Sequence, residues 1–317
     1  MTKRTFIFDS DGGVDDAQAL IMLVANGKVP DLITTVFGNV GLDQATTNLL
    51  AVLSMLEIAV PVHKGADRPM VQPIIDAKYV HGDDGLGGAR RPEKQAMPAS
   101  DDAIGVLRRT FGDAAAKGDK VDILMIGPLT NLAWALRLEP GIIDGIGTLT
   151  IMGGNVYGRG NTTPAAEFNI YADPEAAHVV LTAGIETVVV PWEPCTTHFM
   201  SGERIDALFD GIPENPLRDF SNALAMHARQ NRIRYGAPDR LLYVDPLAAA
   251  VLLDPSSITK SILASSSVAL APGITRGMTL VDPSGRLGTP KITFVEEVDI
   301  GKVDELYAVS AAYVPKR

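Results

Sequence analysis

Short apolar runs alternate with amphipathic segments along the first two thirds of the chain. The runs at 6–8 and 32–36 are almost continuously apolar, which is typical of strands buried on both faces of a parallel sheet. Apolar side chains recur at helical spacing from about residue 15 to residue 24, and a second helix is expected over 44–56. The pattern therefore begins as strand, helix, strand, helix.

The same alternation continues further along the chain. Apolar runs at 121–127, 148–154 and 186–191 predict three more parallel strands, each tied to a helical segment. Strands and helices that alternate in this way indicate a doubly wound α/β fold. We expect a mainly parallel sheet flanked by helices, with a Rossmann-like core.

The last third of the chain has a different pattern. A helix is expected over 216–232, a loop over 236–240, and strands over 262–270 and 291–298. No linker, internal repeat or low-complexity tract precedes these segments. The late strands should extend the same sheet or form a small antiparallel appendage, and residues 1–317 should form a single domain.

Composition narrows the class of partner. A net charge of -10 without a Lys/Arg cluster argues against nucleic acid or an anionic membrane as the main partner, and favours a small molecule. No apolar run reaches the roughly 18 residues that a membrane helix needs. The only cysteine, Cys195, cannot form an intrachain disulfide. With no signal-peptide core near the first residue, we expect a cytoplasmic protein.

Candidate chemistry begins directly after the first strand. The segment FDSDGGVDD places Asp9, Asp11, Asp15 and Asp16 around two glycines, at the sheet edge where open α/β folds bind ligands. Like charges gathered this closely need a cation, and oxygen ligands favour Ca²⁺ or Mg²⁺. Alternatively, Asp15 or Asp16 only caps the following helix, while the other two aspartates form turns with the glycines.

This segment resembles the Asp-x-Asp-Pro-Gly-x-Asp-Asp hallmark of the nucleoside hydrolase family, inosine-uridine preferring type. Gly12 replaces the family's proline, which loosens the loop but removes no ligand. Further similar stretches follow in the family's order: FGN at 37–39, HGDDGLGG from His81, IGPLTNLA from Ile126 and GNTTPAAEFNIYADPEAA from Gly160. The resemblance runs from residue 9 to about residue 250, and it implies the nucleoside hydrolase fold.

The resemblance also implies a metal site. Asp11, Asp16, Asp245 and the backbone carbonyl of Ile126 would hold one Ca²⁺, and Asp11 would be the general base that activates a water bound to this ion. Ile126 stands where a threonine is commoner, but a carbonyl ligand belongs to the backbone. Without the resemblance, Asp245 would be interpreted as a helix N-cap before Pro246.

A second implied group binds the sugar. Asn161, Glu167 and Asn169 resemble the residues that hold the ribose hydroxyls, and Asp15 would reach the 2′ or 3′ hydroxyl. Asn39 would orient the general base or the attacking water. Without the resemblance, the first three residues would be interpreted as a polar surface loop, and Asn39 is also typical of a turn after a strand.

The base end departs from the family, because Val244 stands where a histidine usually precedes the late aspartate. Valine cannot protonate a base. His81 could contact the base or the 5′ side of the nucleoside, and Phe168 could stack on the base. Other candidates for this end, each with an ordinary structural interpretation as well, are His227, Arg232, Arg234, Tyr235, Trp134, Trp192 and Tyr243.

The resemblance implies calcium-dependent hydrolysis of ribonucleosides to ribose and free base, in nucleoside salvage, by a homo-oligomer (dimer or tetramer). Three alternatives stay open. The substrate could be a modified nucleoside or another ribosyl compound, or the chain could be a catalytically silent, calcium-dependent ribose-binding protein. A phosphatase or phosphotransferase with an aspartate nucleophile would need a downstream lysine and further acids in that family's order, whereas the later stretches resemble nucleoside hydrolases.

Overall fold

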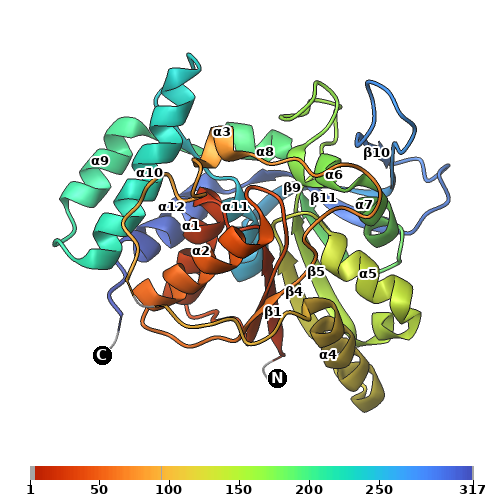
Figure 1. The fold of residues 1–317 in the computed structure, drawn as a ribbon. Coiled ribbons are helices and arrows are strands. Elements are labelled where there is room, and N and C mark those ends of the chain that lie inside the picture. The colour runs from red at the N-terminus through yellow and green to blue at the C-terminus, as the bar shows by residue number, and fades with distance from the viewer. Residues whose placement is uncertain (1–3, 94, 316–317) are drawn as a thin grey trace.

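A nine-stranded sheet runs through the protein, in the order β10-β9-β11-β6-β5-β4-β1-β2-β3 (Figure 1). The computed structural model describes residues 4–93 and 95–315. Seven neighbouring strands, from β3 to β11, pair in parallel, and β9 is antiparallel to both β11 and β10. The predicted α/β fold with a mainly parallel sheet is confirmed. The strands of this sheet are β1 Phe6–Ser10, β2 Leu32–Thr35, β3 Val62–Lys64, β4 Val121–Met125, β5 Ile146–Met152, β6 Thr187–Val190, β9 Ile258–Val268, β10 Thr279–Asp282 and β11 Lys291–Val298.

The position of β1 in the middle of the sheet explains why the residues from Phe6 to Phe8 are all apolar. Phe6 and Phe8 pack into the hydrophobic cluster on one face of the sheet, and Ile7 packs into the cluster on the other face. Its neighbour β4 repeats this division, with Leu124 on the first face and Ile123 on the second. Successive side chains of a strand point to opposite faces, so a strand covered on both sides needs apolar residues at every position.

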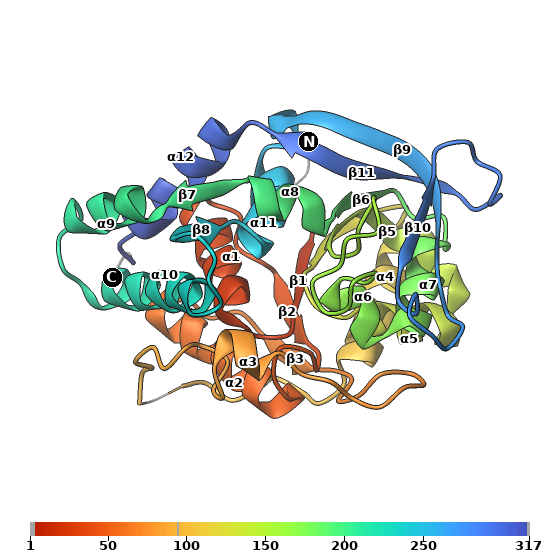
Figure 2. The ribbon, with the colours of Figure 1, turned by 90° about the horizontal axis from the view of Figure 1, so that it is seen from above.

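Helices cover both faces of the sheet (Figure 2). One layer contains α1 Val14–Ala25, α2 Leu42–Met55, α9 Gly202–Asp210, α10 Pro216–Arg234, α11 Asp245–Leu253 and α12 Ile300–Ala311. The other contains α4 Ala103–Lys117, α5 Thr130–Leu138, α7 Pro174–Leu181 and the 3-10 helix η1 Pro140–Gly145. Within the described ranges, no helix combines the length and the apolar character needed to cross a membrane. The short helices are α3 Lys78–His81, α6 Phe168–Ala172, α8 Trp192–Thr197 and the 3-10 helix η2 Pro255–Ser257.

The late strands extend the main sheet, which decides between the two arrangements expected from the sequence. β11 pairs in parallel with β6, and β9 and β10 follow it at the edge. A separate two-stranded antiparallel ladder joins β7 Phe199–Ser201 to β8 Arg240–Leu242. The sequence did not predict β3, β7 or β8, because three residues are too few to form a recognisable period.

The strand order places a topological switch point between β1 and β4. From β3 to β6 the order is 3-2-1-4-5-6, as in Rossmann folds. The chain runs from β1 to β2 on one side, whereas β4 lies on the other side of β1, so the loops after β1 and β4 diverge. In such sheets the crevice for a ligand lies at this point. The loop after β1 carries Asp11, and the loop after β4 begins with Ile126.

Candidate active site

A cavity of about 300 Å³ lies at this edge of the sheet. Its size lies at the lower end of the range typical of small-molecule sites. The chain brings most of the predicted site residues to its wall, although they come from distant segments. Those that line it are Asp15, Asn39, His81, Ile126, Asn161, Glu167, Phe168, Asn169 and Asp245. Asp11 and Asp16 do not line the cavity and are fully buried.

Asp11 follows β1 and is held by Asn39 from the loop after β2. Its Oδ2 accepts a hydrogen bond from the backbone N–H of Asn39 at 2.8 Å, and its Oδ1 accepts one from Nδ2 of Asn39 at 2.9 Å. A Cβ on Gly38 would lie 2.0 Å from Oδ2 of Asp11, so only glycine leaves space for this carboxylate. Burial and the nearby charge of Asp16 hold the pKa of Asp11 well above its usual range.

Asp16 closes the loop at the start of α1. Its carboxylate accepts hydrogen bonds from Oγ of Ser10 at 2.6 Å, from the backbone N–H of Gly13 at 2.8 Å and from Nδ2 of Asn39 at 3.0 Å. Asp16 therefore takes part in capping the helix, as one interpretation of the sequence expected. Capping does not remove this residue from the acidic cluster, because burial and the charge of Asp15 raise its pKa.

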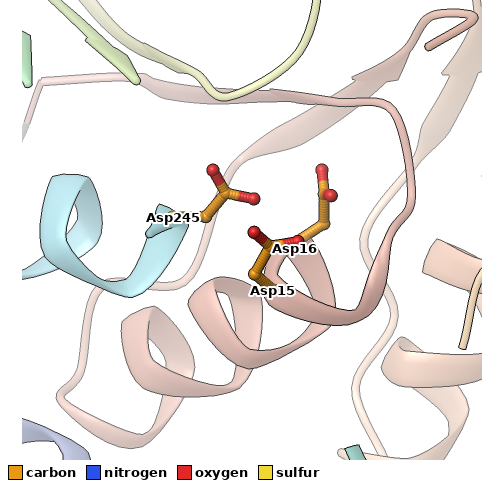
Figure 3. Close-up of side chains that lie close together, drawn as sticks. All are labelled: Asp15, Asp16 and Asp245. Atoms are coloured by element: carbon orange, nitrogen blue, oxygen red, sulfur yellow. The ribbon is translucent and has the colours of Figure 1, made fainter. Parts of the chain in front are cut away.

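Three carboxylates meet between the first turns of α1 and α11. Asp15, Asp16 and Asp245 each present an oxygen within 4.8 Å of the others (Figure 3). Oδ1 of Asp15 is buried without a hydrogen-bond partner. Asp245 is only 2% exposed, and burial with the charges of the other acids holds its pKa well above its usual range. Val244 occupies the N-cap position of α11, so Asp245 is not the predicted cap.

This cluster fits a hard divalent cation. Within residues 4–93 and 95–315, no lysine or arginine forms an ion pair with any of the three carboxylates. Buried like charges repel unless a cation lies among them, and an all-oxygen donor set favours Ca²⁺ or Mg²⁺. The carbonyl of Ile126 also lines the cavity wall, where it accepts a hydrogen bond from Nδ2 of Asn169 at 3.0 Å.

The fourth aspartate of the motif has other partners. Asp9 lies within β1, and its Oδ2 accepts hydrogen bonds from Oγ1 of Thr34 in β2 at 2.5 Å and from Nδ2 of Asn131 in α5 at 2.8 Å. Burial raises the pKa of Asp9 to about 7. Asp9 is therefore bonded to its neighbours in the fold, whereas Asp15 and Asp16 of the same motif meet Asp245 from a distant part of the chain.

Gly12, which replaces the family's proline, does not loosen the loop. Its φ is +71°, and a Cβ there would lie 2.5 Å from Cα of Ala45 in α2. Proline fixes φ near -65°, so this loop conformation excludes it. The glycine instead allows the loop to pack closely on α2.

Glu167 and Asn169 form a rigid part of the cavity wall at the start of α6. Oε1 of Glu167 accepts a hydrogen bond from the backbone N–H of Asn169, and Oε2 accepts one from that of Gly154, both at 2.9 Å. Nδ2 of Asn169 also donates to the carbonyl of Met152 at 3.1 Å. Burial raises the pKa of Glu167 to about 7. These bonds fix both side chains before any ligand binds.

The other predicted contacts surround this wall. Asn161 is exposed, and its Oδ1 accepts a hydrogen bond from the backbone N–H of Phe168 at 2.8 Å. His81 is buried, and its Nδ1 accepts a hydrogen bond from the backbone N–H of Val14 at 3.2 Å and lies 3.6 Å from Oδ1 of Asp15. Burial lowers the pKa of His81 to about 4, so the ring is neutral at pH 7.

The candidates for the base end divide clearly. Val244, Trp192, Arg232 and Tyr235 line the cavity, as does Asn231, which the sequence analysis missed because no motif marks it. The other candidates lie elsewhere: Arg234 is exposed and does not line the cavity, Trp134 lies on α5, and Tyr243 is buried in the core with its hydroxyl donated to Asp304. His227 is considered further below.

Comparison with known proteins agrees with this geometry. The sequence model of the family described as inosine-uridine preferring nucleoside hydrolase matches residues 6–305. The chain is 34% identical over 313 residues to the non-specific ribonucleoside hydrolase RihC of Salmonella enteritidis PT4, covering 98% of each chain. It is 36% identical over 304 residues to the pyrimidine-specific ribonucleoside hydrolase RihB of Escherichia coli O17:K52:H18, covering 93% of this chain and 92% of that protein.

Solved structures show the same fold. A plant nucleoside hydrolase, the PpNRh1 enzyme, matches with a TM-score of 0.87 and 27% identity, covering 98% of this chain and 99% of that one. An inosine-guanosine nucleoside hydrolase matches with the same TM-score and identity, covering 99% and 100%. The resemblance found in the sequence motifs is confirmed. The chain belongs to the inosine-uridine preferring nucleoside hydrolase family and is a ribonucleoside hydrolase, an enzyme that cleaves N-glycosidic bonds.

Proposed function

We propose that this enzyme hydrolyses common ribonucleosides to ribose and free base with the help of Ca²⁺, and that Asp11 is the general base. The observation that carries this proposal is the cluster of Asp15, Asp16 and Asp245 beside the cavity, with which no lysine or arginine of the described residues forms an ion pair. Keeping these carboxylates ionised at neutral pH is costly without a cation among their oxygens, because burial and mutual repulsion raise their pKa values.

Asp11, Asp16, Asp245 and the carbonyl of Ile126 would hold the ion. Calcium takes roughly six to eight oxygen ligands, so these groups leave positions open for water or sugar hydroxyls. When bound, the ion would supply a positive charge that polarises water and orients the sugar. Asp15 belongs to the same cluster, and we assign it to a ribose hydroxyl.

The chain's own residues would then act on the sugar. Asp11 accepts a proton from the water that attacks C1′, and Asn39 fixes its carboxylate through two hydrogen bonds. Asn161, Glu167 and Asn169 bind ribose hydroxyls. The transition state carries positive charge on the sugar ring, and the buried carboxylates offset that charge from fixed positions.

Two classes of substrate fit the base end of the cavity. Val244 at the cavity wall favours a changed base site, and hence the alternative of a modified nucleoside or another ribosyl compound. The two relatives described above act, by their names, on ribonucleosides in general and on pyrimidine ribonucleosides. We favour common nucleosides, because the ribose-binding residues are complete.

The test is ribose release from inosine, adenosine, guanosine, uridine and cytidine by the purified enzyme in phosphate-free buffer. We expect equal amounts of ribose and free base from at least one of them. If none is cleaved while a modified nucleoside is, the alternative substrate replaces this proposal. Binding of Ca²⁺ and ribose without cleavage of any nucleoside would instead favour the silent binding protein.

Three further properties complete the proposal. We propose that residues 1–317 form one domain, because one sheet joins elements from both ends of the described chain. A cytoplasmic location fits the single buried cysteine, Cys195. A dimer or tetramer is proposed from the family resemblance alone.

The position of Asp11 gives a testable consequence at a neighbouring glycine. Gly38→Ala should lower kcat by about 10²-fold, because the new Cβ would push the Asp11 carboxylate away from its position, and a displacement of about 1 Å can have this effect. Gly41→Ala is the matched control, because nothing lies within 4 Å of a Cβ at that site. Steady-state kinetics with inosine or uridine, beside thermal melts, would check both variants. Equal activity of the two variants would contradict the proposed position of Asp11.

A further inference from the structure

We propose that Arg232 is the residue that binds the leaving base and stabilises it as it departs, in the role that Val244 cannot fill. The inference rests on the proposed function, since it assumes a nucleoside in the cavity. It assigns to the base end a cationic hydrogen-bond donor from α10, instead of an acid beside the late aspartate.

The first observation is that the guanidinium of Arg232 has no partner among residues 4–93 and 95–315. Its Nε is buried and makes no hydrogen bond. No acid in the described part of the chain forms an ion pair with it, whereas Arg229, one turn earlier on the same helix, is paired with both Asp206 and Asp239. Burial and the charge of Arg240 lower the pKa of Arg232. A buried donor without a partner is costly for stability, and a ligand with acceptor atoms would satisfy it.

The second observation is the position of Arg232 between two cavities. Arg232 lines the cavity of about 300 Å³ described above and also an adjoining cavity of about 120 Å³. Val244 lines both spaces too, so the guanidinium shares its part of the wall with the residue that replaces the family's histidine. Trp192 also borders both cavities and gives this region an aromatic surface. A flat heterocycle with polar edges suits such a region.

The other polar candidates on α10 and at its C-terminal end fit this role less well. His227 lines only the adjoining cavity, and its Nε2 already donates to the carbonyl of Val80 at 2.9 Å. Tyr235 is 65% exposed, so water screens its hydroxyl. Asn231 borders both cavities, but its neutral amide would stabilise a departing anion less than a cation would. Arg232 is the one cation of the group that lines both cavities, and it is half-buried.

The hydrolysis step balances although Arg232 gives up no proton. As the C1′–N bond breaks, its electron pair stays on the base, and the guanidinium donates hydrogen bonds to a carbonyl oxygen or ring nitrogen where negative charge grows. Water adds its hydroxyl to C1′ and gives its proton to Asp11. The base then takes its proton from solvent, so ribose and neutral base are the products. Bases that carry such acceptor atoms are the predicted substrates.

The test compares leaving groups. Arg232→Met keeps an unbranched apolar stem but removes the charge and the donors, and should lower kcat/KM for inosine and uridine by about 10²-fold. Hydrolysis of p-nitrophenyl riboside should change little, because p-nitrophenolate leaves without assistance. That activity also reports that the variant is folded. Arg232→Lys, which keeps the charge, should recover part of the loss. Arg234→Met is the matched control, since this exposed arginine does not line the cavity.

The possible results distinguish the role of Arg232 from the proposed function on which it rests. A loss confined to natural nucleosides supports the role of Arg232. Equal losses on both substrates, or no loss on either, would overturn that role and leave the hydrolase mechanism intact. A wild-type enzyme that cleaves p-nitrophenyl riboside but no common nucleoside would overturn the proposed substrate and, with it, this assignment.

Discussion

Replacing Asp11 by alanine is expected to lower kcat for inosine or uridine by about 10³-fold or more, with a much smaller effect on folding. The carboxylate is fully buried and is held by two hydrogen bonds from Asn39, so no other group can easily move into its place. A general base alone contributes about 10²- to 10⁴-fold, and Asp11 is also a proposed ligand of the ion. Steady-state kinetics with excess Ca²⁺ would measure the loss.

Stability distinguishes a chemical role of Asp11 from a structural one. Without metal, burial and the charge of Asp16 disfavour the ionised carboxylate of Asp11. Its removal should therefore leave the metal-free protein no less stable than the metal-free wild type, as seen in thermal melts. An Asp11→Ala variant that keeps a tenth or more of the activity would rule out Asp11 as the general base.

Removing divalent metal should abolish activity and lower thermal stability, and added Ca²⁺ should restore both. A ligand present at about a thousandfold above its Kd stabilises the native state by about 4 kcal/mol, which for a chain of this length corresponds to roughly 6 °C. Repulsion among Asp15, Asp16 and Asp245 makes the metal-free cluster unfavourable, so the ion relieves a strain already present. Chelation followed by thermal melts and kinetics would measure both effects.

Two variants, one at the proposed metal site and one away from it, test whether the stabilisation by Ca²⁺ depends on this site. Asp245→Asn, in the first turn of α11, should lose most of the Ca²⁺-dependent increase in melting temperature. Glu203→Gln, an exposed acid in the first turn of α9, should keep it. A chelated enzyme that remains fully active, or an equal calcium response in both variants, would contradict a metal site at Asp245.

Much of the fold could be predicted from the sequence, because buried parallel strands leave a strong local signal. The strands β4 and β6, for example, are apolar at all but one position each, and helical spacing follows each of them along the chain. The strands β3, β7 and β8 have three residues each and depend on their neighbours in space. Their pairing is a long-range property, which a local pattern does not contain.

The roles of site residues could be predicted where the residues belong to a sequence motif. They could not be predicted where a role depends on contacts with residues far away in the sequence. Asn39 was expected to orient the general base or the water, and its hydrogen bonds to Asp11 are observed. Tyr243, a candidate base platform, instead donates a hydrogen bond to Asp304, a residue 61 positions further along the chain. The missing partner of Arg232 is likewise visible only in three dimensions, because every arginine looks equally available in a sequence.

The most direct test of the central claim is a crystal structure of the enzyme with Ca²⁺ and ribose, with the ion located by its anomalous signal. We predict one calcium peak among the carboxylates of Asp11, Asp16 and Asp245 and the carbonyl of Ile126, with ribose hydroxyls beside it and Glu167 in contact with the sugar. Ribose bound in this cavity with no ion among these groups, from crystals of an active enzyme, would contradict the account.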